Sequence, residues 1–123
     1  MLFRSLWPGR CDDAFPFRSL FDAGVSLRLG SDAPVAPLDP WRAMAAAVHR
    51  NTPDLESWHP EERITATEAF RASVRTRVAV GQPADVILLD ANPLERLGDS
   101  ASTASHLVGT TVSATYVAGR RTY

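Results

Sequence analysis

The stretch LRLGSDAPVAPLDPW, residues 27–41, joins an apolar run to a loop that contains three prolines. Apolar and polar residues alternate from Val25 to Leu29, which predicts a β-strand over residues 25–30. A glycine and a serine follow at the end of this run, and then comes Asp32. The sequence therefore predicts a strand that stops beside a single carboxylate.

A short helix is expected on each side of this stretch. The segment PFRSLFDAG, residues 16–24, has a proline at its start and a glycine past its end, as helices often do. After the loop, Asp39 is a good N-cap and Pro40 a good first residue for the helix PWRAMAAAVHR, which should end near Asn51. A strand between two helices indicates an α/β fold, but a lone strand needs neighbours with which to pair.

Strand signals dominate the second half of the chain, after one more helix. Thr65 and Glu68 have the spacing of a capping box and predict a helix over TATEAFRASV. The apolar run DVILLD, residues 85–90, predicts a buried strand. We expect a short helical turn in NPLERLG and a loop over the Ser/Thr/Ala-rich residues 99–105. The last stretch, VGTTVSATYVAGRRTY, predicts a hairpin that turns at residues 118–119.

Composition limits the possible functions. The 123 residues are 45% hydrophobic and 22% charged, with a formal net charge of −1, which suits an ordinary globular domain. There is no basic block, so nucleic acid and anionic membrane surfaces are not expected as partners. No signal peptide or transmembrane run is evident, and we expect a cytoplasmic protein. Because all 13 basic residues are arginine, this chain holds no lysine for Schiff-base or P-loop chemistry or for carbamylation.

Asp32 is the main candidate for chemistry. The carboxyl ends of parallel strands are where α/β barrels place catalytic groups. A carboxylate there can bind a metal ion or take a proton from a metal-bound water. The alternative is an aspartate that only accepts hydrogen bonds from loop amides, which is the commoner use of a single carboxylate in a turn.

The other reactive groups give weaker signals. The three histidines are far apart in sequence and form no HxH or HExxH motif: His49, His59 and His106. A zinc site built only from these histidines and Asp32 is therefore not expected. Ser31 lacks the G-x-S-x-G context of a nucleophile and is expected to help the backbone turn. Cys11, the single cysteine, cannot form an internal disulfide and has no obvious base beside it.

Four stretches in a fixed order resemble the C-terminal segment of proteins in the amidohydrolase superfamily. They are FPFRSLFDAGVSLRLGSD, WHPEERITATEAFRASV, VGQPADVILLDANPLE and VSATYVAGRRTY. The resemblance extends from about Trp7 to Tyr123 and is strongest to the branch that contains N-substituted formamide deformylases. The occurrence of GSDAPV and PADVILLD in this order is much more specific than either motif alone.

The resemblance implies a fold in two parts. Residues 1–75 would be the C-terminal end of a (β/α)8 TIM-type barrel, with residues 25–30 as its last strand. Residues 76–123 would be the C-terminal part of the accompanying small β-sandwich. The family's metal-binding HxH motif, its bridging Lys or acidic residue and its two later histidines have no counterpart in this sequence. A full barrel needs at least ~200 residues, so we expect an incomplete barrel that depends on a missing N-terminal barrel segment or a partner chain.

The resemblance also implies a reaction. The completed protein would be a metal-dependent amidohydrolase that cleaves an amide-type C–N bond of a small molecule. A divalent metal, expected to be zinc, would activate water in the completed site. Asp32 would bind this metal, take a proton from the water and return it to the leaving amine. Ser31, Pro34 and Leu38 lie in or beside the loop after the strand and are expected to contact the substrate.

Two alternatives stay open from the sequence. The chain is either part of this hydrolase or a non-catalytic remnant that acts as an oligomerisation or interaction module. In the second case, apolar surfaces left without a barrel would favour homo-oligomers. A small independent binding domain with a chance likeness is a third possibility, which the ordered motifs disfavour.

Overall fold

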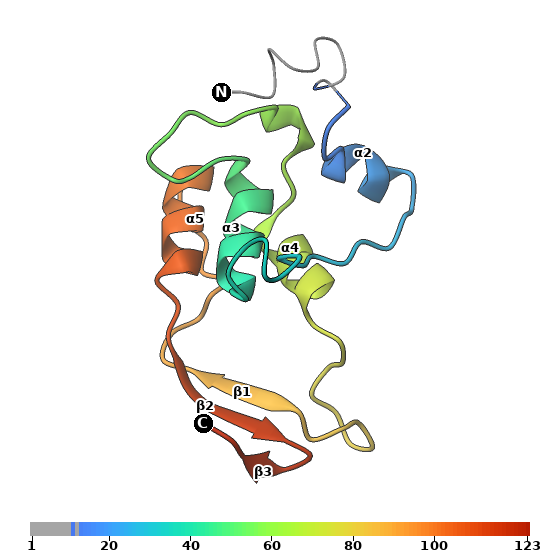
Figure 1. The fold of residues 1–123 in the computed structure, drawn as a ribbon, viewed down its shortest axis with the longest axis vertical. Coiled ribbons are helices and arrows are strands. Elements are labelled where there is room, and N and C mark those ends of the chain that lie inside the picture. The colour runs from blue at the N-terminus through green and yellow to red at the C-terminus, as the bar shows by residue number, and fades with distance from the viewer. Residues whose placement is uncertain (1–10, 12) are drawn as a thin grey trace.

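A computed structural model of the chain describes residue 11 and residues 13–123 (Figure 1). The helices gather in one part of the molecule, and a small sheet lies at the opposite end from α2. The helical elements are α2 (Phe17–Asp22), α3 (Pro40–His49), the 3-10 turn η1 (Pro60–Glu62), α4 (Ala66–Ser73) and α5 (Ser100–Val108). The strands are β1 (Val86–Leu89), β2 (Val112–Val117) and β3 (Arg120–Arg121). The described residues therefore form a mixed α/β structure with a small antiparallel sheet.

Helix α3 forms where the sequence predicts it. One carboxylate oxygen of Asp39 accepts hydrogen bonds from the backbone N–H groups of Trp41, at 3.0 Å, and Arg42, at 3.2 Å. Pro40 occupies the first turn, where its missing N–H leaves no helical hydrogen bond unmade. The helix ends at Arg50, whose φ of 67° is left-handed and breaks the helical repeat.

The predictions for α2 and α4 are also confirmed. In α4, the Thr65 hydroxyl accepts a hydrogen bond from the Glu68 N–H at 3.2 Å, and the Glu68 carboxylate accepts one from the Thr65 N–H at 2.7 Å. These two reciprocal bonds make up the expected capping box. Helix α2 follows Pro16, and Gly24 with a φ of 77° lies just beyond its end.

The buried core lies where α3 packs against α5 and α4. Met44 from α3 and Leu107 from α5 are its largest fully buried side chains. The remaining members of this cluster are Trp41, Ala45, Ala47, Val48, Ile64, Ala69 and Ala104. Each large apolar side chain taken from water contributes roughly 1.5–3 kcal/mol, so the helices are held mainly by this cluster.

The three strands form one antiparallel sheet in the order β1-β2-β3. Ala118 and Gly119 join β2 to β3, and both have positive φ, at 50° and 75°. Positive φ at both central residues is the geometry of the favoured two-residue hairpin turn, so the predicted hairpin and its turn are confirmed.

The prediction that DVILLD would be a buried strand is wrong in part. The strand forms, but Ile87 and Leu88 are 45% and 51% exposed. The sheet holds only three strands in the described chain, and its apolar positions near the helices, Leu89 and Val112, are the ones that pack against the core. The middle of β1 therefore has little to cover it.

The prediction of a loop over residues 99–105 is wrong, because these residues begin α5. The Asp99 side chain accepts a hydrogen bond from the Ser102 N–H at 2.8 Å and caps the helix. Ala104 and Leu107 are completely buried against the rest of the core. This tertiary packing outweighs the weak helix propensity of the Ser/Thr-rich segment.

The strand predicted over residues 25–30 does not form among the described residues, because no other strand lies beside it. The segment is tied instead to α4: the Leu29 N–H donates a hydrogen bond to the Ala72 carbonyl at 3.0 Å. The helical turn expected in NPLERLG does not form a helix. The segment holds one hydrogen-bonded turn, in which the Glu95 N–H donates to the Asn92 carbonyl at 3.3 Å. The Asn92 side chain also accepts a hydrogen bond from the Leu94 N–H at 3.0 Å.

Candidate functional site

Asp32 lies in the exposed loop between the 25–30 segment and α3. Its φ of 51° is left-handed, and its backbone carbonyl accepts a hydrogen bond from the Val35 N–H at 2.8 Å. The carboxylate accepts no hydrogen bond from any described residue, so it caps none of the loop amides in the described chain. An aspartate in a left-handed turn with an uncommitted carboxylate is available to bind a ligand or to transfer a proton.

The segment that leads to Asp32 is held by the C-terminal end of α4. The Arg28 guanidinium donates hydrogen bonds to the carbonyls of Val74, at 2.7 Å, and Arg71, at 3.4 Å. Together with the bond from Leu29 to Ala72, these contacts satisfy carbonyls at the end of α4. They fix the backbone three to four residues before Asp32.

A second set of contacts fixes α2, the helix before this segment. Arg18 of α2 donates two hydrogen bonds to the Glu68 carboxylate, at 3.0 and 2.6 Å, and one to the Arg63 carbonyl at 3.2 Å. The Arg18 side chain holds the pKa of Glu68 at about 2, below its usual 4.5. In turn, Glu68 raises the pKa of Arg18. Helix α4 and the residues just before it therefore anchor both α2 and the segment that leads to Asp32.

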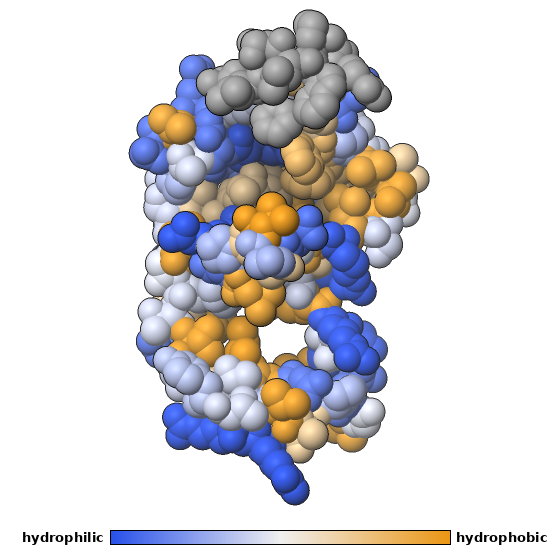
Figure 2. All heavy atoms as spheres, in the orientation of Figure 1, coloured by the Kyte–Doolittle hydropathy of each residue, from blue (hydrophilic) through white to orange (hydrophobic). Residues whose placement is uncertain are grey.

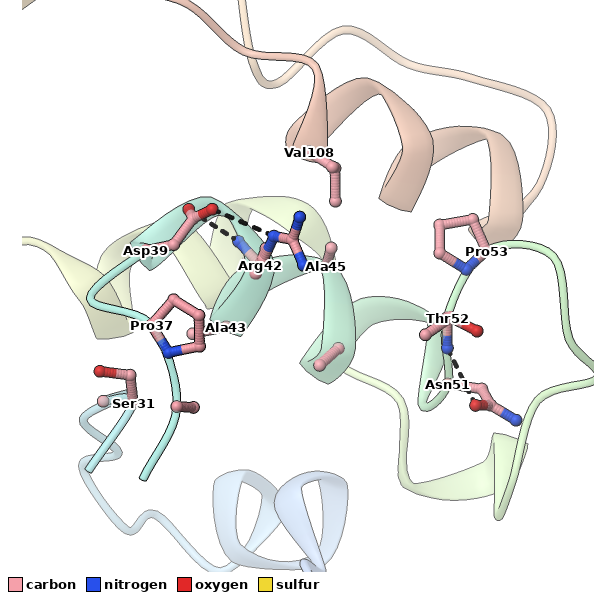
Figure 3. Close-up of a pocket in the computed structure, with 13 residues that line it drawn as sticks. Ser31, Pro37, Asp39, Arg42, Ala43, Ala45, Asn51, Thr52, Pro53 and Val108 are labelled. Atoms are coloured by element: carbon pink, nitrogen blue, oxygen red, sulfur yellow. Dashed lines mark hydrogen bonds and ion pairs between the residues drawn. The ribbon is translucent and has the colours of Figure 1, made fainter. Parts of the chain in front are cut away.

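A cavity of about 590 Å³ lies between the loop after Asp32 and α3 (Figure 3). Ser31 and Pro37 line it from the loop, and Val108 of α5 faces them across α3. Within the cavity, Asp39 and Arg42 point toward each other, and their side chains are 3.3 Å apart. The lining is mostly apolar with this one ion pair, which suits a small ligand with a polar group.

Of the residues predicted to contact substrate, only Ser31 lines this cavity. Ser31 lines the cavity, and its hydroxyl is buried without a hydrogen-bond partner in the described chain. Pro34 and Leu38 are exposed on the loop and are not among the residues that line it. Leu38 is 87% exposed, and Asp32 also lies outside the cavity lining.

Each histidine is engaged in a structural contact. His49 is buried, and its two ring nitrogens lie 3.0 Å from the Ser100 hydroxyl and 2.9 Å from the Leu55 carbonyl. The Nδ1 atom of His59 lies 2.6 Å from a Glu61 carboxylate oxygen. The Nε2 atom of His106 lies 2.8 Å from the Asn92 carbonyl. In the described structure the three histidines therefore make contacts with the protein, far apart from one another in the sequence.

The described residues do not form a metal site on their own. Among them, no group of three or more His, Cys, Asp and Glu side chains is placed to hold a metal ion. Asp32 can offer one ligand, whereas a catalytic zinc site takes three from the protein. A metal at Asp32 would need ligands from outside this set of residues.

Two charged groups that the fold brings into cavities were not predicted from the sequence. Arg42 lies three residues after Asp39, the N-cap of α3, and this i, i+3 spacing is a local sequence signal for the ion pair between them. Arg50 is buried at the end of α3 among aromatic residues that are distant in sequence. No local pattern in the sequence points to that burial.

Comparison with known proteins relates this chain to amidohydrolases. A sequence model described as "Amidohydrolase family" matches residues 1–123. N-substituted formamide deformylase of Arthrobacter pascens is 31% identical over 106 residues, which are 74% of this chain and 20% of that protein. Protein LONG AFTER FAR-RED 3 of Arabidopsis thaliana is 30% identical over 124 residues, which are 90% of this chain and 20% of that protein. The chain thus spans about a fifth of the length of the curated relatives it matches. No solved structure matches it.

Proposed function

The chain belongs to the amidohydrolase family, and we propose that it is the part of a hydrolase of amide-type C–N bonds that carries the Asp32 carboxylate. One observation carries this proposal beyond family membership: the Asp32 carboxylate is exposed and uncommitted on a segment that α4 fixes in place. A side chain that only stabilised the loop would be expected to bond to loop amides.

The role proposed for Asp32 is proton transfer. An ionised carboxylate can take a proton from the water that attacks an amide carbonyl and return it to the leaving amine. Ser31, next to it, contributes a hydroxyl at the cavity wall that can donate a hydrogen bond to a bound substrate. Pro34 and Leu38 would contact substrate only with further polypeptide over the exposed loop.

Members of this family generally use a divalent metal, and the described residues form no group of three or more side chains that could hold one. We therefore assign no step of the reaction to a metal. The proposed architecture also needs further polypeptide. In this proposal, residues 1–75 form the C-terminal end of a barrel, and residues 76–123 form part of a β-sandwich. Barrel strands from further polypeptide would pair with residues 25–30 and complete the site.

The name of one relative suggests a substrate class. N-substituted formamides carry an amide-type C–N bond, and the bacterial relative is named for their deformylation. We propose that a simple N-substituted amide is the substrate here. A panel of N-substituted formamides and acetamides, with release of the amine as the signal, would test this on the protein as isolated from its source.

Variants at Asp32 separate catalysis from folding. Asp32→Asn keeps the shape of the side chain but removes the base, so we expect at least a ~100-fold loss of amide hydrolysis. Asp54→Asn, at another exposed loop position, is the matched control and should keep full activity. Unchanged hydrolysis by the Asp32→Asn protein would exclude Asp32 as the base.

A second candidate function is an oligomerisation or interaction module. The observation that favours it is the number of large apolar side chains left on the surface of both parts of the molecule (Figure 2). They include Val35, Leu38, Val78, Val80, Ile87 and Leu88. Such surfaces promote association. Stable homo-oligomers with no hydrolytic activity in the protein from its source would favour this function over the first.

A further inference from the structure

Arg50 is a buried cation in an aromatic setting. Only 8% of the residue is exposed, although arginine is rarely buried without a charged partner. Its guanidinium carbon lies 5.2 Å from the centroid of the Phe17 ring and 5.1 Å from that of Trp58. Arginine stacks on aromatic rings in this way while its in-plane N–H groups stay available as donors.

Most of those donors have no hydrogen-bond partner in the part of the chain that the structure describes. One terminal nitrogen of Arg50 donates a hydrogen bond to the Ala14 carbonyl at 3.2 Å. The Nε atom is buried and has no hydrogen-bond partner among the described residues. A guanidinium carries five N–H groups, so several N–H donors of Arg50 remain that can bind a planar acceptor such as a carboxylate.

No carboxylate of the described chain forms an ion pair with Arg50. Burial lowers the pKa of Arg50, and the more distant carboxylates of Glu62 and Glu61 offset this only in part. Glu62 is itself bonded to Ser19, and Glu61 to His59. A buried charge without a partner is unfavourable, and a carboxylate bound as a fork-like pair would relieve it.

Arg50 also lines a cavity of about 350 Å³. The walls are mainly aromatic and aliphatic: Phe15, Phe17, Leu29, Ala43, Ala46 and Trp58. A concave apolar site with one charged group is typical of pockets for small organic acids, because the walls take the apolar body and the cation fixes its orientation. The cavity volume suits a ligand of about the size of a single ring.

We propose that this cavity binds a small monocarboxylate with an aromatic or aliphatic body, and that Arg50 pairs with the carboxylate. This cavity adjoins the one beside Ser31, with which it shares Gly30, Ala43, Ala46 and Asn51, but Asp32 lines neither. The inference does not rest on the proposed reaction. An acidic side chain of another polypeptide offers the same chemical group, but the small apolar chamber favours a free acid.

Titration of the 123-residue chain with benzoate, followed by NMR of backbone and indole N–H groups, tests the proposal. We expect benzoate to bind with a Kd of ~1 mM and to shift the Trp58 indole signal. Benzamide has the same shape as benzoate without its charge, and it should bind more weakly than benzoate by at least about tenfold. Equal binding of benzoate and benzamide, or no binding of benzoate, would overturn the proposal.

Variants test the role of Arg50. Arg50→Met keeps an apolar stem and should weaken benzoate binding by about tenfold to a hundredfold, whereas the exposed Arg120→Met on β3 should leave it unchanged. If circular dichroism shows that Arg50→Met does not fold, Arg50→Lys replaces it in the test. Lysine keeps the positive charge but lacks the two parallel N–H donors of the guanidinium, so this variant should bind benzoate several-fold more weakly than the wild type. Binding at the wild-type level by a folded Arg50 variant would overturn the proposal.

The source of the carboxylate is tested in the same titration. An N-acetylated, C-terminally amidated glutamate mimics a protein side chain and should bind several-fold more weakly than benzoate, because it leaves the aromatic walls unfilled. Tighter binding of the glutamate mimic would contradict the assignment to a small free acid.

Discussion

The helical part of the molecule and its sheet differ in how they bury apolar residues. In the helical part, Met44 and Leu107 are completely enclosed by side chains from α3, α4 and α5. In the sheet, the central residues of β1 remain about half exposed, although their sequence is just as apolar. Equally apolar sequences thus have different environments, because only the helices supply each other with a covering layer.

The segment that carries Asp32 resembles the sheet more than the helices. It is fixed at one edge by Arg28 and Leu29, while Leu38 and Val35 extend into solvent. Within the described chain, the helical part buries its own apolar side chains, whereas the sheet and the Asp32 loop leave theirs on the surface, where we propose that further polypeptide packs.

The largest expected effect is in the helical core. Leu107→Ala should lower the free energy of unfolding by about 2–5 kcal/mol, because it removes a fully buried side chain and leaves a cavity. Urea unfolding followed by circular dichroism would measure this. The matched change in the sheet, Leu88→Ala, should lower it by about 1 kcal/mol or less. Equal losses at the two positions would contradict the difference between the two parts.

The second effect is the Arg18–Glu68 pair, which joins α2 to α4. Because folding lowers the pKa of Glu68 from 4.5 to about 2, the pair contributes stability above pH 4.5 and loses it as the pH falls through about 2. Glu68→Gln should reduce the free energy of unfolding at pH 7 by about 1–3 kcal/mol. Urea unfolding of both proteins between pH 7 and pH 2 would measure the difference.

The control for this pair is Glu56→Gln, which changes an exposed carboxylate. The difference between wild type and Glu68→Gln should shrink toward zero at low pH, while the Glu56→Gln protein should follow the wild type throughout. A constant difference at all pH values would show that packing, and not the charge of Glu68, stabilises this junction.

Helix capping gives a third, smaller effect within the helical part. Asp99→Ala and Asp39→Ala each remove a side chain that accepts hydrogen bonds at a helix N-terminus, and each should reduce stability by about 0.5–2 kcal/mol. Thermal melting of both variants would measure this. A negligible effect of Asp99→Ala would show that burial of α5 alone, without its cap, determines where the helix starts.

The smallest expected effect is at Asp32. Because its carboxylate makes no hydrogen bond with the described residues, Asp32→Asn should change the free energy of unfolding by no more than about 0.5 kcal/mol. The urea experiment used for the core variants can resolve this. A loss above about 1 kcal/mol would indicate a structural role for Asp32 and would weaken its assignment to catalysis.

Local signals were sufficient to predict much of the helical part and the turn of the hairpin. The Asp39 cap, the Thr65–Glu68 capping box and the turn at Gly119 each depend on residues close in sequence, and all three form as predicted. The start of α5 was not predicted, because this helix depends on burial against α3. The Ser/Thr-rich sequence has a weak helix propensity and does not indicate that burial.

The candidate site was predictable only in part. Asp32 and Ser31 stand out in the sequence because they follow an apolar run. The sequence also indicated that a strand at residues 25–30 would need neighbours, and none of the described strands lies beside it, so the segment stays irregular. The aromatic setting of Arg50 likewise joins Phe17 and Trp58 from separate segments. Long-range contacts of this kind arise only from the packed structure.

The central claim is that the Asp32 loop works only together with further polypeptide. Native mass spectrometry of the protein purified from its source, without added metal, tests this most directly. We predict a mass well above 13.4 kDa, either because the sequence is part of a longer chain or because a different second chain accompanies it. A lone 13.4 kDa species, or a homo-oligomer of it, would contradict the claim and leave the family relationship as one of ancestry and not of activity.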